Sequence, residues 1–268
     1  MKASTNSPAV LAVAAHPDDI EFLMSGTMLR LREAGWRLHY LNLANGCCGT
    51  ATEPAQAIAS RRRGEAIEAA RAIGAIFHES MVNDLEIFYT YDLIARVLAV
   101  VREARPRILL VHSPDDYMED HTISQRVAVT AAFCRGMINY VSIPERPPVA
   151  DEVTIYHAMP AGMRGPLRQR VTAGQYADVS PTMATKRAML ACHRSQKEWL
   201  DVSQGMDSYL DIMVERCREA GRLSGRFEYA EGWRRHNHLG FSATDTDPLG
   251  DALGDACWTD PEYETALG

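Results

Sequence analysis

Four short apolar runs, each followed by a segment with helical periodicity, constrain the fold of this chain most strongly. Val10–Ala15 and Arg107–His112 are typical of strands buried on both faces of a sheet, and Leu38–Ala44 and Ile76–Ser80 are predicted as two further strands. The helical segments that follow them are Glu21–Ala34, Ala55–Gly74, Tyr91–Ala104 and about Thr122–Tyr140. This alternation predicts a Rossmann-like α/β fold, with a mostly parallel sheet, helices on both faces and right-handed crossovers.

The pattern weakens beyond residue 140, and the C-terminal part is expected to be an extension of the same domain. The tail after Asp245 is rich in Asp, Gly and Pro, so we expect it to wrap the surface or contact a neighbour. We expect one domain over residues 1–268, with a core at about 9–200 and an extension at about 201–268. Its further elements are a strand over Glu152–Ala158 and helices over Met183–Leu200 and Asp207–Ala220.

Composition excludes several classes of partner. The 35 acidic and 28 basic residues give a net charge of -7, which argues against a nucleic acid or an anionic membrane as the main partner. The six cysteines show no CxxC spacing, which is typical of a reduced, cytoplasmic protein. The sequence shows no signal-peptide pattern and no apolar stretch of membrane-spanning length, so a cytoplasmic location is predicted.

Polar clusters follow two of the predicted strands at the point where each strand ends. His16-Pro17-Asp18-Asp19 follows the first strand, and a segment from His112 to His121 follows the fourth. In a doubly wound sheet, ligands bind beyond the carboxyl ends of the strands, so these clusters are expected to share one crevice. A nucleotide site is not indicated, because no GxGxxG or GxxxxGK[ST] motif follows the first strand.

The two clusters together contain the side chains that a hydrolytic zinc site requires. Such a site takes three His or carboxylate ligands and leaves one position for water, and His16, Asp19 and His121 provide that number. Asp18 lies beside a ligand and suits a general base that deprotonates the water. Two alternatives stay open at this point: Asp18 or Asp19 caps the following helix, and His16 is a core histidine with satisfied hydrogen bonds.

The chain also resembles a known family in three ordered blocks. "AHPDDIE", "SRRRGEAIEAARAIG" and "PRILLVHSPDDYMEDH" are similar to the PIG-L/LmbE family of zinc-dependent N-deacetylases over residues 9 to about 135. The resemblance implies Zn²⁺ bound by His16, Asp19 and His121, and Asp18 as the base. It also implies a small-molecule substrate with an N-acetylated amino sugar, cleaved to a free amine and acetate.

The resemblance extends to two further positions that could touch the sugar. The RxxE pattern of the family falls on Arg62 and Glu65, and its loop aspartate falls on Asp84. Arg62 and Asp84 are therefore expected to contact sugar hydroxyls, although Arg62 could equally be a structural ion-pair partner. Another divalent ion would suit the same ligands, because two histidines and a carboxylate select weakly among metals.

The chain departs from the family pattern at Met118. Many members carry a histidine at this position that stabilises the oxyanion, whereas a thioether cannot donate a hydrogen bond. Loss of one such donor can cost about 3 kcal/mol of transition-state stabilisation. Candidate replacements are Tyr117 and the cluster Arg234, Arg235, His236 and His238. By resemblance to relatives that use a C-terminal histidine of a neighbouring subunit, His236 or His238 could complete the site in a homo-oligomer; the alternative is a solvated basic turn.

These features predict a hydrolase that removes an N-acetyl group from an N-acetylglucosamine-type sugar or glycoconjugate. Two alternatives remain: an amidase that cuts a larger acyl group from a thiol-sugar conjugate, and a sugar- or metal-binding protein without turnover. The other histidines have less specific roles. His112 is expected to support the metal site, and His193 is expected to pack within a helix. His39, His78 and His157 lie in predicted strands and are expected to be core histidines.

Overall fold

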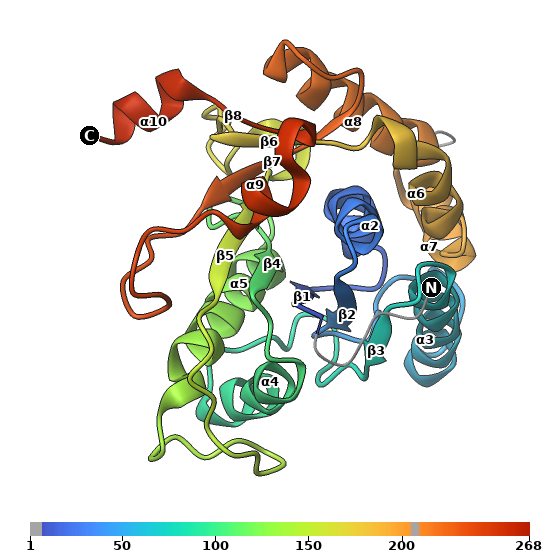
Figure 1. Cartoon of the computed structure of the whole chain (residues 1–268). Helices are drawn as coiled ribbons and strands as arrows, with labels where there is room; N and C mark the ends of the chain where they lie inside the picture. Colours follow the sequence, from blue (N-terminus) through green and yellow to red (C-terminus); the bar gives the residue numbers. More distant parts are fainter. Residues whose placement is uncertain (1–6, 205–208) are drawn as a thin grey trace.

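An eight-stranded sheet with the order β3-β2-β1-β4-β5-β7-β6-β8 runs through the molecule (Figure 1). The computed structural model describes residues 7–204 and 209–268. The strands are β1 (Ala9–Ala14), β2 (Arg37–Asn42), β3 (Ile76–His78), β4 (Ile108–Val111), β5 (Thr154–Ala158), β6 (Gln175–Asp178), β7 (Ala230–Arg235) and β8 (Cys257–Thr259). Neighbouring strands from β3 to β5 pair in parallel, and β7, β6 and β8 pair antiparallel. The predicted Rossmann-like, mostly parallel α/β fold is confirmed.

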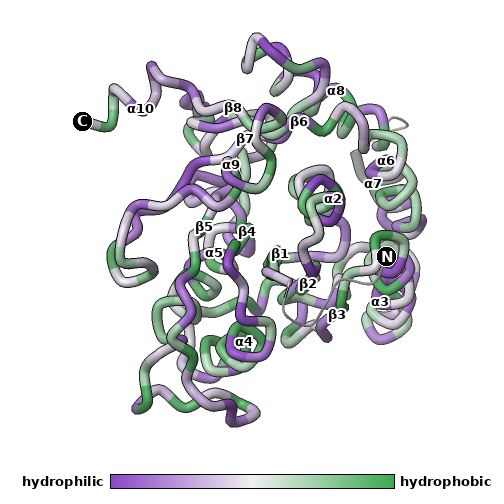
Figure 2. Tube along the Cα trace, viewed as in Figure 1, coloured by the Kyte–Doolittle hydropathy of each residue, from purple (hydrophilic) through white to green (hydrophobic). Residues whose placement is uncertain are grey.

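Helices cover both faces of the parallel part of the sheet, and alternate residues of β1 divide the core between these faces. Val10, Ala12 and Ala14 pack with α1, α2 and α3, whereas Leu11 and Val13 pack with α4 and α5. In Figure 2, α4 carries hydrophobic residues interleaved with hydrophilic ones. The helices are α1 (Asp19–Leu23), α2 (Ser25–Glu33), α3 (Ala55–Ala72), α4 (Tyr91–Ala104), α5 (Glu119–Phe133), α6 (Met183–Leu190), α7 (Arg194–Gln204), α8 (Tyr209–Ser224), α9 (Pro248–Leu253) and α10 (Pro261–Leu267).

The segment expected as one helix over Glu21–Ala34 is two helices that meet at Met24. The backbone of Met24 leaves the helical region, with φ -132° and ψ -20°. The carboxylate of Glu231 on β7 accepts hydrogen bonds from the N–H groups of Gly26 (2.8 Å) and Thr27 (2.7 Å). Because these N–H groups belong to the first turn of α2, a distant side chain stabilises this helix start. The break therefore depends on a tertiary contact.

The C-terminal part joins the same sheet instead of only wrapping its surface. The segment AEGWRR is strand β7, and its Trp233 is fully buried. In the tail, the hydroxyl of Tyr156 donates to Oδ1 of Asp247 (2.6 Å), and Leu249 is buried against α2. Strands β6, β7 and β8 were not predicted, because their short sequences show no simple alternation of apolar and polar residues.

Three predicted helices differ clearly in their bounds. The helix expected at about Thr122–Tyr140 is α5, which begins at Glu119 and ends at Phe133. The segment Met183–Leu200 is interrupted between α6 and α7, where His193 is buried. Of the segment Asp207–Ala220, residues 207 and 208 lie outside the described residues, and the rest belongs to α8. No helix in the described part of the chain is long and apolar enough to cross a membrane.

Candidate active site

The loop between β1 and α1 carries the first cluster of functional side chains. Asp18 occupies the N-cap position of α1 with φ 106°, a left-handed conformation that is uncommon outside glycine and is found at functional sites. Its side chain makes no capping hydrogen bond, so helix capping does not account for this residue. Asp19 begins the helix, and its Oδ2 accepts a hydrogen bond from the N–H of His16 (2.7 Å).

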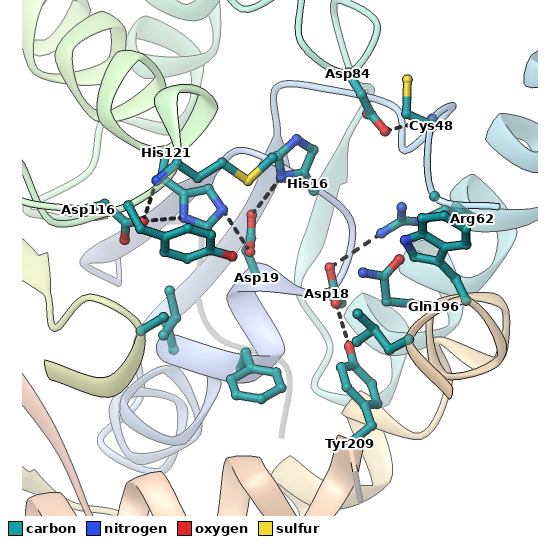
Figure 3. A pocket seen from close by; sticks show the side chains of 18 of the residues that line it. His16, Asp18, Asp19, Cys48, Arg62, Asp84, Asp116, His121, Gln196 and Tyr209 are labelled. Atoms are coloured by element: carbon teal, nitrogen blue, oxygen red, sulfur yellow. Dashed lines mark hydrogen bonds and ion pairs between the residues drawn. The ribbon is translucent and has the colours of Figure 1, made fainter. Parts of the chain in front are cut away.

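The three side chains predicted as metal ligands lie together. One candidate ligand atom from each of His16, Asp19 and His121 falls within 4.8 Å of the others. Oδ2 of Asp19 is 3.5 Å from Nδ1 of His16, and Oδ1 of Asp19 is 3.4 Å from Nε2 of His121. Figure 3 shows both imidazoles beside Asp19. Two imidazoles and a carboxylate form a ligand set found in hydrolytic zinc enzymes, so these residues fit a divalent metal ion.

Two further carboxylates orient these histidines. Nε2 of His16 is 2.9 Å from Oδ2 of Asp120, and Nδ1 of His121 is 3.0 Å from Oδ1 of Asp116. Each imidazole thus turns one nitrogen toward Asp19 and the other toward a supporting carboxylate, the usual arrangement of metal-binding histidines. Burial lowers the pKa of both imidazoles, but the carboxylates outweigh it and raise the pKa of His16 to about 9 and that of His121 to about 10. The carboxylates around the two imidazoles therefore stabilise positive charge at this site.

His112 supports the cluster from the end of β4. Its Nε2 accepts a hydrogen bond from the N–H of Ala15 (3.0 Å) and lies 3.3 Å from Oδ2 of Asp19. Its ring stacks on His121 with centroids 4.1 Å apart and an interplanar angle of 7°. His112, Asp116 and His121 also lie close enough to form a metal group. Because Nε2 of His112 already has a backbone donor, we assign it to support and not to ligation.

Asp18 lies outside the ligand cluster and is held by two residues from distant parts of the chain. The hydroxyl of Tyr209 on α8 donates to Oδ2 of Asp18, and a guanidinium nitrogen of Arg62 lies 3.4 Å from Oδ1 (Figure 3). Burial raises the pKa of Asp18 to about 6, although Arg62 lowers it. A carboxyl group with a pKa in this range can both accept and release a proton near neutral pH.

The other predicted contact residues lie at the same site. Arg62 is buried, and its guanidinium donates to the carbonyls of Pro17 (2.6 Å) and Gly46 (3.3 Å). Its ion pair with Asp18 fits the structural alternative. Asp84 accepts hydrogen bonds from the N–H groups of Gly46 (2.6 Å) and Cys48 (2.9 Å). Tyr117 is 64% exposed and contacts the edge of His121. Contacts from Arg62, Asp84 and Tyr117 to a sugar stay predictions.

The predicted C-terminal histidines lie away from the metal cluster of their own chain. Nδ1 of His236 is 2.9 Å from Nε2 of His157, and Nδ1 of His157 is 2.9 Å from the carbonyl of His112. The carbonyl of His238 accepts hydrogen bonds from the next turn of the chain. Neither His236 nor His238 lines the cavity, so a contribution from a neighbouring subunit stays a prediction.

A cavity of about 520 Å³ joins the ligand cluster to Asp18. Met118, the position at which a donor was expected, lines it as well.

Sequence reasoning missed the residues that close the cavity from the C-terminal half, because they lie on ordinary amphipathic helices without a motif. These residues are Gln196, Trp199 and Leu200 on α7, and Tyr209 and Arg216 on α8. It also missed the roles of Asp116 and Asp120, for which the only signal was their place in the loop that ends at His121.

The fold and the cluster define an α/β protein with a candidate metal site at the carboxyl edge of its parallel strands. Residues 11–132 match the model of the PIG-L family, described as GlcNAc-PI de-N-acetylase. This match confirms the resemblance to the PIG-L family that the three sequence blocks indicate.

The chain is also similar to individual proteins. Diacetylchitobiose deacetylase of Thermococcus kodakarensis is 26% identical over 233 residues, which are 84% of this chain and 82% of the relative. The 4-oxalmesaconate hydratase of Pseudomonas putida is 28% identical over 136 residues, 48% of this chain and 53% of the hydratase. Among solved structures, N,N'-diacetylchitobiose deacetylase from Pyrococcus horikoshii has a TM-score of 0.73 at 22% identity, covering 91% of this chain and 89% of that one.

Proposed function

We propose that this protein is a zinc-dependent hydrolase that removes the N-acetyl group from an N-acetylglucosamine-type sugar or glycoconjugate. The observation that carries the proposal is the presence of Asp18, a buried carboxylate held outside the ligand cluster, in one cavity with His16, Asp19 and His121. The PIG-L match and the similarity to a diacetylchitobiose deacetylase support the substrate class.

In this proposal, one set of residues binds the metal and a second set orients the ligands. His16, Asp19 and His121 hold the metal, and Asp116 and Asp120 orient the two imidazoles. Zinc, when bound, supplies a Lewis acid that polarises the amide carbonyl and lowers the pKa of water in its coordination sphere. These are the conditions under which a nearby carboxylate can act as a base at neutral pH.

Asp18 is the proposed proton carrier. It takes a proton from the attacking water and later passes it to the nitrogen of the leaving amine. The hydrogen bond from Tyr209 and the ion pair with Arg62 keep its carboxylate in one orientation during both transfers. Both transfers then use one side chain, and the reaction releases acetate and a free amine.

The tetrahedral intermediate of amide hydrolysis needs a hydrogen-bond donor for its oxyanion, and Met118 cannot provide one. Tyr117 lines the cavity next to His121 and is the donor that we propose within the chain. His236 or His238 of a neighbouring subunit is the alternative.

A second function is favoured by the similarity to 4-oxalmesaconate hydratase, which extends over 136 residues of this chain. Hydration also begins with an activated water, so Asp18 could serve either reaction. The substrate distinguishes them, because a hydratase adds water to an unsaturated acid and releases no acetate.

The decisive test is acetate release from a panel of N-acetylated sugars by purified, zinc-loaded protein. We expect turnover of at least one N-acetylglucosamine derivative, and a loss of about 10²- to 10⁴-fold in Asp18→Asn, the range over which general bases contribute. Asp115→Asn is a matched control, because Asp115 lies in the metal-site loop but pairs with Arg234 outside the cavity. Bound zinc without acetate from any sugar would refute the proposal. Consumption of 4-oxalmesaconate would then indicate the hydratase, and release of a larger acyl group the amidase alternative.

A further inference from the structure

One guanidinium in the wall of the cavity has no anionic partner. Arg216 lies on α8 and lines the cavity, and no hydrogen bond or ion pair joins its guanidinium to the side chains described for residues 7–200 and 209–268. Its Cζ lies 4.8 Å from the centre of the Phe22 ring. Burial lowers the pKa of Arg216, which shows that the group is partly withdrawn from water. An arginine nevertheless stays charged in a protein, so its donors are available to a ligand.

The other arginines of α8, unlike Arg216, have anionic partners on the same helix. Arg218 donates to Glu215 and to the hydroxyl of Tyr229 (3.0 Å), and Arg222 lies 3.9 Å from Glu219. Arg218 and Arg222 do not line the cavity. An unpaired guanidinium is therefore found on α8 only where the helix borders the cavity.

Among the described residues, no carboxylate of the cavity accepts a hydrogen bond from Arg216, although the charge of Asp116 acts on it from a distance. Asp18 accepts from Tyr209, and Asp19 lies between the two ligand histidines. Asp84 accepts from two backbone N–H groups, and Asp116 lies beside His121. An incoming anion would thus find free donors at Arg216 alone among the cavity arginines, since Arg62 is bound to loop carbonyls and Asp18.

A series of aromatic contacts holds Arg216 at a defined place relative to Asp18. Phe22, under the guanidinium, contacts Tyr209 with ring centroids 5.5 Å apart, and Tyr209 binds Asp18. Phe22, Leu23 and Arg216 also line a smaller, adjoining cavity with Met159 and Met163. Arg216 therefore stands where the space beside Asp18 continues toward an apolar groove, at a position suited to the non-reacting part of a substrate.

We infer that Arg216 binds an anionic group, phosphate or carboxylate, on the non-reacting part of the amino-sugar substrate. The inference rests on the proposed deacetylase function and narrows its substrate class to acidic amino sugars. A planar guanidinium can form two parallel hydrogen bonds with either oxyanion, and partial burial strengthens them. Arg216 is thus a specificity-determining residue, and the chemistry remains with Asp18 and the metal site.

Substrate selectivity tests this inference directly. The probes are N-acetylglucosamine 6-phosphate and N-acetylmuramic acid as the phosphate and carboxylate arms, with neutral N-acetylglucosamine as the reference. We expect wild type to prefer at least one acidic sugar by kcat/KM. Arg216→Ala should lower that acidic-to-neutral ratio about 10- to 100-fold, mainly through KM. Arg216→Lys should retain part of the preference, and Arg218→Ala should leave the ratio and the overall activity unchanged.

Binding measured without turnover separates this inference from the proposed function. Calorimetry on Asp18→Asn protein, with and without Arg216→Ala, reports affinity for the same sugars. If neutral sugars release acetate but Arg216→Ala leaves the ratio unchanged, the subsite is wrong and the deacetylase stands. If no sugar is hydrolysed but acidic sugars bind in an Arg216-dependent way, the subsite stands without the proposed reaction. Equal losses on acidic and neutral sugars, with a lower unfolding midpoint, would assign Arg216 a structural role and overturn the inference.

Discussion

The hydroxyl of Tyr209 donates a hydrogen bond to Oδ2 of Asp18 across a separation of 191 positions in the sequence. Tyr209 is buried, and burial together with the charge of Asp18 raises its pKa, so the phenol keeps the proton that it donates. The first residue of α8 thereby orients a carboxylate of the β1–α1 loop. The C-terminal part of the chain is thus a component of the candidate site.

Replacement of Tyr209 by Phe tests this contact. Because a hydrogen bond to a charged group contributes about 1.5–3 kcal/mol, we expect kcat to fall about 10-fold or more if the bond positions Asp18 for proton transfer. The measurement is steady-state acetate release with bound zinc quantified for each sample. Tyr229→Phe is the control, since that hydroxyl binds only Arg218 in the described structure. Unchanged kcat in Tyr209→Phe would show that Asp18 does not need this donor.

The carboxylates behind the ligand histidines should govern metal affinity. Asp116→Asn and Asp120→Asn keep the shape of the site but weaken the support of His121 and His16, so each should weaken zinc binding about 10- to 100-fold. Competition with a chromophoric chelator measures the affinity without reference to turnover. Asp151→Asn, which removes only a surface partner of Arg105, should bind zinc like wild type. Equal affinity in all three variants would contradict the assignment.

The buried pair Lys186–Glu231 should contribute strongly to stability. Both side chains are almost fully buried, and their charged atoms are 2.6 Å apart. The carboxylate of Glu231 also accepts hydrogen bonds from the N–H groups of the first turn of α2. Glu231→Gln leaves the ammonium without a countercharge, so the free energy of unfolding should fall by about 3–5 kcal/mol. Urea denaturation measures this change, with the exposed Glu215→Gln as control. A loss below about 1 kcal/mol would mean that the glutamine replaces the carboxylate adequately.

The pair His39–His78 should make the fold sensitive to acid. Nδ1 of His39 is 2.9 Å from Nε2 of His78, and burial, with the charges of His78 and Arg37, lowers the pKa of His39 to about 3. Between pH 6.5 and about 3 the unfolded chain binds a proton that folded His39 does not. The free energy of unfolding therefore falls as the pH drops through this window, by at most about 1.4 kcal/mol per pH unit. Urea midpoints at several pH values should show a shallower slope in His39→Gln, and equal slopes would rule out this role.

A shared site between subunits predicts complementation between two inactive variants. His236 and His238 do not line the cavity of their own chain, so a role for either needs a second copy. If a second copy, and not Tyr117, provides the oxyanion donor, His236→Ala or His238→Ala should lose about 10²- to 10³-fold in kcat, the effect of one missing donor. Mixed with Asp18→Asn protein, that variant should regain activity as hybrid oligomers form. Full turnover in both alanine variants would remove the histidines from the mechanism.

The parallel part of the fold could be predicted because its information is local. Apolar runs such as Val10–Ala15 identify strands buried on both faces, and helical periodicity identifies the crossovers. The break of the first helix at Met24 could not be read in this way. It depends on Glu231, which caps α2 from a strand more than two hundred positions away.

The sequence by itself determined that His16, Asp18, Asp19 and His121 would follow strand ends, and the parallel topology then brings such residues to one edge of the sheet. Only the tertiary structure decided what surrounds them: the carboxylates behind the histidines, Tyr209 on Asp18, and Arg216 over the ring of Phe22 in the cavity wall. The physical reason is the range of the interactions. Periodicity and strand ends are properties of neighbouring residues, whereas hydrogen-bond partners and the charges of a cavity wall depend on which distant helices pack around it.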